Sequence, residues 1–260
     1  MTDLTKPEAP VEHLSVSAIK KYFTSPKKFY DVYVMKKPFV SSFTMETGKA
    51  WHKALESHYL GASDPLQIAT TYFIENYSKL PEEEKDADAM AKALVALEKN
   101  FNDYITIKKE WVPLHLEISA KCGSPTENGL PLKGQIDVIT TSRGILDHKY
   151  VKTRGGQAGE GEETSTFHYV QAWFYFYLYR ELMKEDPLYF IIAEYKQTKN
   201  RDGSSQYKES MVLYEDPWMK KLDKWYDDFC INLRYQRRFL PNPFQSYGAD
   251  DWAEYLNSPL

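Results

Sequence analysis

Two short apolar segments joined by a turn place charged residues where a fold normally buries its side chains. The segments are Gly134–Ile139 and Ile145–Lys149, and Ser142-Arg143-Gly144 between them is typical of a turn. We expect two neighbouring β-strands, with Asp137 on the first and Asp147 and Lys149 on the second. Burying such charges costs free energy unless they are paired or bind a cation. The segment therefore predicts a sheet whose centre carries ion pairs or an oxygen-ligand metal site.

Strand geometry decides which of these charges can meet. Side chains alternate faces along a strand, so Asp147 and Lys149 are expected on one face and His148 on the other. Glu117 lies between Leu116 and Ile118 on a preceding strand, so its carboxylate can reach the same place. Ion pairs between Lys149 and either aspartate explain these residues as well as a metal site does. The strands alone leave both alternatives open.

Two predicted helices carry further polar residues. Gly48 and His52 are one turn apart in a helix expected over 45–60, and Gln171 and Tyr175 are one turn apart in a helix over 166–182. Gly48 is expected to let its helix approach another backbone closely. Taken alone, His52 is explained by an ordinary hydrogen-bonded histidine and Gln171 by an exposed glutamine on an amphipathic helix.

The order of predicted elements indicates the fold class. The hydrophobic periodicity, together with the glycines and prolines that interrupt it, predicts an α/β fold with a central mixed β-sheet, α-helices on both faces and a helical N-terminal portion. We expect a flexible tail over 1–13 and a single domain over 14–260, divided into a helical part (14–110), a sheet core (111–214) and a C-terminal helix and tail (215–260). Helices are expected over 14–24, 26–34, 45–60, 65–79, 86–108, 166–182 and 217–239, strands over 111–118, 133–140, 144–151, 188–197 and 207–214, and a glycine-rich loop over 155–163.

Composition excludes several classes of protein. The net charge of −4, from 33 basic and 37 acidic residues, argues against a protein that coats nucleic acid, although a local groove can still be basic. The two cysteines, Cys122 and Cys230, have no zinc or iron–sulfur spacing, and we expect free thiols. No apolar run reaches the length of a membrane span and no signal peptide is apparent, so an intracellular location is expected.

The motifs in their order resemble the PD-(D/E)XK nuclease superfamily, in particular the branch with RecB-type nuclease domains, Cas4-like exonucleases and phage recombination exonucleases. The resemblance covers most of residues 14–179 and implies a restriction-endonuclease-like fold. The opening helix matches except that Ser25 replaces the usual cysteine before Pro26. The residues that carry the resemblance are Leu14–Ile19, Ser25–Tyr30, Gly48, His52, Glu117, Gly134–Asp137, Asp147–Lys149, Gln171 and Tyr175.

This resemblance implies a role for each matching residue. His52, Asp137 and Asp147 would bind Mg²⁺ or Mn²⁺, helped by the backbone carbonyl of His148, and Glu117 would support a second ion or its water. Lys149 would be the catalytic lysine, and Gln171 and Tyr175 would position DNA or order the acids and the lysine. Asp147 stands where a glutamate is more usual, which shortens the reach of that ligand. Cas4 proteins with a cluster use four cysteines, so no iron–sulfur cluster is expected here.

The expected substrate is DNA. Most basic pairs are explained as solvated surface; Lys27, Lys28, Lys152 and Arg154 are the candidates for phosphate contacts. The resemblance implies a metal-dependent exonuclease that acts on DNA ends in recombination or repair, in the cytoplasm of a bacterial or phage-infected cell. A single-strand annealing or recombination protein is a candidate partner, and the chain is a candidate homo-oligomer. The alternatives are a structure-specific endonuclease with the same site and a catalytically silent subunit that binds DNA or a partner.

Overall fold

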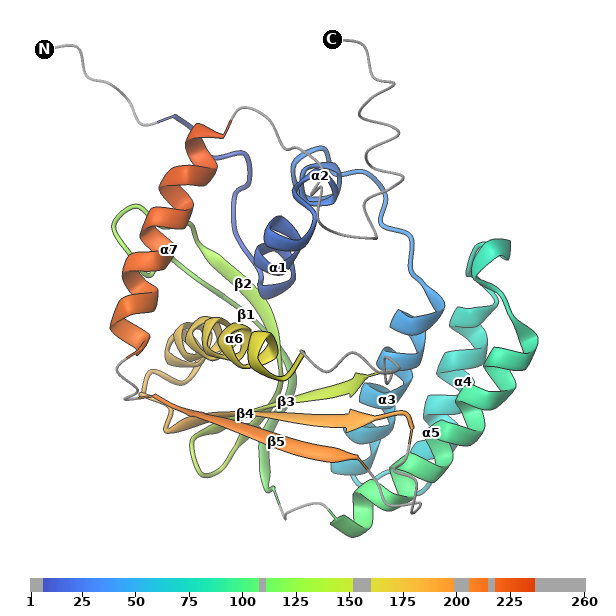
Figure 1. Cartoon of the computed structure of the whole chain (residues 1–260). Coiled ribbons are helices and arrows are strands. Elements are labelled where there is room, and N and C mark those ends of the chain that lie inside the picture. Colours follow the sequence, from blue (N-terminus) through green and yellow to red (C-terminus); the bar gives the residue numbers. More distant parts are fainter. Residues whose placement is uncertain (1–6, 108–110, 152–159, 199–205, 215–217, 237–260) are drawn as a thin grey trace, which may run out of the picture.

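A five-stranded mixed β-sheet lies at the centre of the structure, a computed structural model that describes residues 7–107, 111–151, 160–198, 206–214 and 218–236 (Figure 1). The strands lie side by side in chain order. Neighbours are antiparallel except β3 and β4, which are parallel and joined through helix α6 (Glu160–Met183), as a parallel pair requires a crossover. The strands are β1 (Pro113–Cys122), β2 (Leu132–Thr140), β3 (Gly144–Val151), β4 (Tyr189–Lys196) and β5 (Tyr207–Leu213).

The other helices begin at residues suited to helix N-termini. Ser15, Ser42 and Asp64 each accept a hydrogen bond from a backbone N–H three residues later, and Pro26 and Pro65 occupy first turns. These helices are α1 (Val16–Thr24), α2 (Pro26–Phe29), α3 (Phe43–Tyr59), α4 (Pro65–Tyr77), α5 (Ala87–Ile107) and α7 (Trp218–Tyr235), with a π-helical turn at Tyr30–Val34 and a 3₁₀ turn at Glu82–Glu84.

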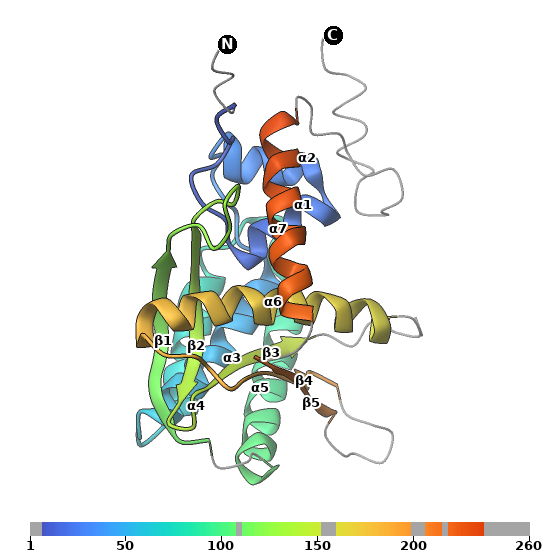
Figure 2. The ribbon, with the colours of Figure 1, turned by 90° about the vertical axis from the view of Figure 1, so that its left-hand side faces the viewer.

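Helices cover both faces of the sheet. Helix α6 runs across the strands on one face, where α1 and α7 pack over it (Figure 2). The core of this side includes Trp173, Phe174 and Phe190, all fully buried. On the other face α3 packs against β3 and β1, and α4 and α5 pack against α3; Trp51 stacks there on Tyr150 of β3 at a centroid distance of 4.6 Å. The expected fold class, a mixed sheet flanked by helices, is confirmed.

Several boundaries differ from the expectation. Residues 160–163 belong to α6, although the glycine-rich segment 155–163 was expected to be a loop. β1 begins at Pro113 and continues to Cys122 because it pairs with β2 along that length. The segment 26–34 divides into α2 and the π-helical turn. Residues 1–6, 152–159 and the C-terminal tail from 237 lie outside the described residues, and the single-domain organisation stays a prediction.

No helix among the described residues is both long and apolar enough to cross a bilayer.

The sheet divides between β2 and β3, beside Glu117 and Asp137. β2 and β3 pair only through Val138 with Leu146 and Ile139 with Ile145, close to the turn, and then separate (Figure 1). Glu117, opposite this point on β1, has a φ of 47°, in the left-handed region. The strands change faces here: Leu116 and Val138 pack toward the α3 side, whereas Ile118 and Ile136 pack toward α6. Regular strands would keep residues two apart on one face, so this local twist creates the opening between β2 and β3.

Candidate metal centre and active site

Three side chains from three elements converge at the opening between β2 and β3. His52 of α3, Glu117 of β1 and Asp137 of β2 offer ligand atoms that all lie within 4.8 Å of one another. His52 Nδ1 is 3.7 Å from Glu117 Oε1 and 3.4 Å from Asp137 Oδ2. None of the three is fully exposed: the exposed fractions of their side chains are 29%, 23% and 12%. The structure therefore brings together three of the residues for which the resemblance implies a role at the metal.

Hydrogen bonds fix the two acids of this cluster. Asp137 Oδ2 accepts a hydrogen bond of 2.8 Å from the backbone N–H of His148, so the carboxylate takes the place of a strand partner where β2 leaves β3. Gln135 Nε2 donates to Glu117 Oε2 at 2.6 Å. Gln135 lies within the motif segment Gly134–Asp137, but the motif alone assigns it no role. The available signal was spacing, because residues 135 and 137 are two apart on one strand beside Glu117.

Asp147 and Lys149 form a second group on β3. Lys149 Nζ lies 2.6 Å from Asp147 Oδ2, and Asp147 is almost completely buried while the lysine is 38% exposed. Both side chains point away from that of His148, as alternation predicted, since His148 packs against Tyr59 and Tyr104 below α3. Asp147 is not part of the three-residue cluster. Its role as a metal ligand and that of the His148 carbonyl remain predictions.

Burial and charge set the protonation of both groups. Burial raises the pKa of Asp137 and that of Asp147, and His52 and Lys149 offset this only in part. Burial alone would lower the pKa of His52, but Asp137 and Glu117 outweigh it and raise that pKa. Asp147 and Asp137 likewise outweigh the effect of burial on Lys149 and raise its pKa. Without a metal, the site therefore holds negative charge poorly and favours protonated His52 and Lys149.

The donor set suits a divalent cation. Carboxylate oxygens are the ligands that Mg²⁺ and Mn²⁺ prefer, and an imidazole nitrogen is a common additional ligand for Mn²⁺. A cation held by His52, Glu117 and Asp137 would relieve the electrostatic cost of burying the acids. A small cavity borders this cluster, lined by His52, Leu55, Glu56, Tyr59, Leu116, Glu117, Asp137, Val138 and His148.

The imidazole of His148 is neutral. Burial, with the positive charges of His52 and Lys149, lowers its pKa to about 3. Its Nε2 is buried and has no hydrogen-bond partner among the described residues. The side chain thus packs behind the cluster as a neutral group, while its backbone N–H holds Asp137.

Gln171 and Tyr175 lie on α6, on the opposite side of the sheet from α3. Both are buried, at 4% and 9% exposure, and their side chains share a hydrogen bond. The reading of Gln171 as an exposed residue is therefore wrong. Burial raises the pKa of the Tyr175 hydroxyl well above its usual range, and the charges of Asp147 and Asp137 add to this. Tyr175 is therefore close enough to Asp147 and Asp137 for their charges to affect its hydroxyl, which stays protonated.

Of the four predicted phosphate contacts, Lys27 and Lys28 lie in the described part of the chain, and neither joins the cluster. Lys27 is paired with Asp31 at 3.2 Å and is only 14% exposed, and Lys37 shares that aspartate at 2.8 Å. Lys28 is exposed, but α2 lies apart from α3 in both views (Figures 1 and 2). Lys152 and Arg154 lie outside the described residues.

Comparison with known proteins gives a family and a fold. The sequence model of the PD-(D/E)XK nuclease superfamily matches residues 13–249. A solved structure from Eubacterium rectale, described as a "putative exonuclease", superposes with a TM-score of 0.51 at 12% sequence identity, covering 96% of this chain and 94% of that chain. The structure of SSO0001 covers 86% of this chain and 96% of its own at 13% identity, but its TM-score of 0.28 carries no argument. No curated protein matches the chain.

Proposed function

Because the chain belongs to the PD-(D/E)XK nuclease superfamily, we propose that it is a deoxyribonuclease that uses Mg²⁺ or Mn²⁺ to hydrolyse phosphodiester bonds at DNA ends. One observation carries the proposal: His52 Nδ1, Glu117 and Asp137 meet within 4.8 Å. The ion pair of Lys149 with Asp147 lies on the neighbouring strand. Three ligands with a protonated lysine nearby suit phosphoryl transfer to water, where negative charge accumulates on the phosphate oxygens.

Each side chain has a defined task in this proposal. His52, Glu117 and Asp137 would hold the cation, and Asp147 would be a further ligand. A cation bound there would supply an acidified water and neutralise charge on the phosphate. Lys149 orients the attacking water or contacts the scissile phosphate. Gln171 and Tyr175 keep the acids and the lysine in place from the α6 side. The attacking water gives up a proton to solvent and forms the new P–O bond while the P–O bond to the leaving oxygen breaks, and that oxygen takes up a proton from solvent.

End-directed cleavage is the finer part of the proposal. It follows the order of the sequence motifs, which resembles exonucleases of recombination, and the description given to the Eubacterium rectale protein agrees with it. We propose the same context for this chain: DNA processing in recombination or repair, together with a single-strand annealing or recombination protein, by a homo-oligomer.

The test compares three substrates with Mg²⁺, with Mn²⁺ and with a chelator. Linear DNA should be degraded only when metal is present, while covalently closed circular DNA of the same sequence stays intact. Cleavage of the closed circle would show an endonuclease. Survival of the linear DNA with both metals, combined with retained binding to it, would show a silent DNA-binding subunit. Relaxed nicked circles, as the third substrate, separate action at breaks from action at ends.

A further inference from the structure

Helix α3 carries a glycine in its interior at a place where nothing in the described structure needs one. Glycine inside a helix is unfavourable compared with alanine, so it normally has a packing or functional reason. A Cβ added at Gly48 would meet no atom within 4 Å. The expectation that Gly48 lets α3 approach another backbone is therefore wrong for the described residues.

At Gly134, by contrast, close packing explains why the residue is a glycine. A Cβ there would lie 3.0 Å from Leu178 and 3.1 Å from Phe174, so α6 fills the space that this glycine leaves. At Gly48 no described residue does so. Within the described part of the chain, this space is left for a molecule from outside.

The position of Gly48 relates this space to the metal ligands. An α-helix turns by about 100° per residue, so Gly48 and Lys49, one turn before His52, lie on nearly the same side of α3 as His52. Viewed along the helix axis, Gly48 is about 40° to one side of His52 and Lys49 is about 60° to the other. Met45, close to the same line two turns earlier, is 40% exposed, and Lys49 is 48% exposed. An uncovered surface thus runs along α3 from its first turn to the candidate metal site. The four residues from Gly48 to His52 span about 6 Å along the axis, or one to two nucleotides at about 3.4 Å each.

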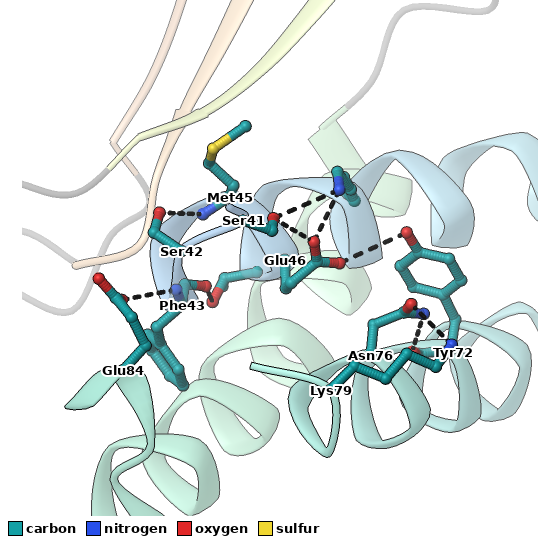
Figure 3. A network of polar contacts seen from close by, with 11 residues as sticks. Ser41, Ser42, Phe43, Met45, Glu46, Tyr72, Asn76, Lys79 and Glu84 are labelled. Atoms are coloured by element: carbon teal, nitrogen blue, oxygen red, sulfur yellow. Dashed lines mark hydrogen bonds and ion pairs between the residues drawn. The ribbon is translucent and has the colours of Figure 1, made fainter. Parts of the chain in front are cut away.

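Lys49 is held in place by a buried acid. Its Nζ lies 2.6 Å from Glu46 Oε1, and the Glu46 side chain is 4% exposed. Ser41 also donates to Oε1, and the Tyr72 hydroxyl reaches Oε2 at 3.5 Å. Figure 3 shows Ser41, Glu46 and Tyr72 pointing toward one another at the start of α3. Burial would raise the pKa of Glu46, but the hydrogen bonds from Lys49 and Ser41 outweigh this and lower it, so the acid is charged.

This arrangement prepares a cation for an anionic ligand. A free surface lysine loses rotamer freedom when it binds, whereas an ammonium already fixed by Glu46 loses less. Lys49 Nζ also donates to Ser41 Oγ at 3.5 Å, which leaves the third of its three hydrogens to contact a phosphate. The glycine beside it leaves room for a sugar-phosphate chain.

We propose that Gly48 and Lys49 form a seat for the sugar-phosphate backbone next to the scissile bond: Gly48 gives clearance, and Lys49 contacts one phosphate. This inference rests on the proposed nuclease function and names a binding subsite for its DNA. The seat guides the strand along α3 toward His52. Neither residue takes part in the bond-breaking step.

Three variants test the space at Gly48, with binding of a fluorescent oligonucleotide in chelator and KM for cleavage as readouts. Gly48→Leu should weaken binding at least tenfold while melting temperature and Mn²⁺ binding stay at wild-type values, because leucine favours helix but fills the space. Gly48→Ala should melt no lower than wild type and lose less affinity, which keeps the test valid if leucine impairs folding. Ala91→Leu places the same side chain at an exposed position of α5 and should change nothing.

Salt dependence tests the phosphate contact. Lys49→Gln can still donate a hydrogen bond to Glu46, but it should reduce the slope of log Kd against log salt by about 0.7–0.9, the value for one phosphate contact. Lys224→Gln removes an exposed lysine of α7 that is paired in a similar way with Asp228, and should leave the slope unchanged.

The outcomes separate this inference from the function on which it rests. If the wild type cleaves DNA and Gly48→Leu binds it equally well, or Lys49→Gln keeps the slope, the seat is wrong and the nuclease proposal stands. If the wild type neither binds nor cleaves DNA with metal, both proposals fail.

Discussion

Glu117 combines a strained backbone with a carboxylate at the candidate metal centre. A φ of 47° is unfavourable for any residue with a Cβ, and such strain is common at functional sites. The conformation turns the strand over between Leu116 and Ile118 and brings the acid to His52 and Gln135. The sequence showed an acid among apolar neighbours, but no local signal for the left-handed backbone, since glycine or asparagine is the usual mark of that region.

Two substitutions at residue 117 separate strain from chemistry. Both Glu117→Gly and Glu117→Ala remove the carboxylate and should lose metal affinity. Glycine relieves the left-handed φ, so its variant should be more stable than the alanine variant by about 1 kcal/mol, the reverse of the usual order in strands. Urea unfolding of the two variants in chelator measures the difference. An alanine variant as stable as the glycine variant would show that residue 117 is not strained.

The acids and the lysine should be needed for cleavage and not for folding. Asp137→Asn keeps an oxygen for the His148 N–H but loses the charge, and Lys149→Ala removes the ammonium beside Asp147. Each should lower the rate of DNA cleavage about a hundredfold or more, with an unchanged circular dichroism spectrum. If either variant cleaves DNA at the wild-type rate, the assignment of that residue is wrong.

At the element scale, hydrophobic periodicity and the interrupting glycines and prolines predicted the strands and helices, but they did not predict that the sheet divides between β2 and β3. The expected strands and helices correspond to β1–β5 and α1–α7 within a few residues. β2 separates from β3 where the Asp137 side chain, instead of a backbone carbonyl, accepts the hydrogen bond of the His148 N–H. This separation also depends on the point at which β1 and β2 both turn their side chains to the opposite faces of the sheet. These are tertiary effects with no local pattern. The low exposure of Lys27, which argues against a phosphate contact, likewise depends on how α2 packs in the fold.

Close packing of α6 on β2 predicts a sensitive glycine. Gly134→Val would push Leu178 and Phe174 away and should destabilise the protein by about 1–3 kcal/mol. Because α6 carries Gln171 and Tyr175, cleavage should fall as well. Gly123→Val is the matched control, since a Cβ there meets nothing within 4 Å, and should change stability by less than about 0.5 kcal/mol. Denaturant midpoints compare the two; equal midpoints would mean that α6 does not pack this closely.

At the scale of the whole molecule, the two helical layers enclose an electrostatically unfavourable centre that a cation would relieve. The raised pKa values of Asp137, Asp147 and His52 mean that the folded protein holds these protons more tightly than the unfolded chain. Their contribution to stability is therefore present at low pH and lost as pH rises through the folded-state values. A divalent cation binds the deprotonated forms and reverses this loss.

Metal should accordingly stabilise the protein more at higher pH. The gain in melting temperature from Mg²⁺ or Mn²⁺ should be small near about pH 5 and larger near about pH 8, where saturation at about 100-fold above Kd gives about 2.7 kcal/mol. Thermal scans with metal and with chelator at the two pH values measure it. His52→Gln should lose most of the gain, whereas His115→Gln, at an exposed position of β1, should keep it. An equal gain at both pH values would argue against metal binding at these groups.

The most direct test of the central claim, that the cluster of His52, Glu117 and Asp137 uses a divalent metal to cleave DNA, is the release of label from linear DNA carrying it at the 5′ or the 3′ end. Wild type and Asp228→Asn, a change at an exposed acid of α7, should release label with Mg²⁺ or Mn²⁺ and not with chelator, while Asp137→Asn should release almost none. Release that continues in chelator, or that is equal in Asp137→Asn and wild type, would contradict the account.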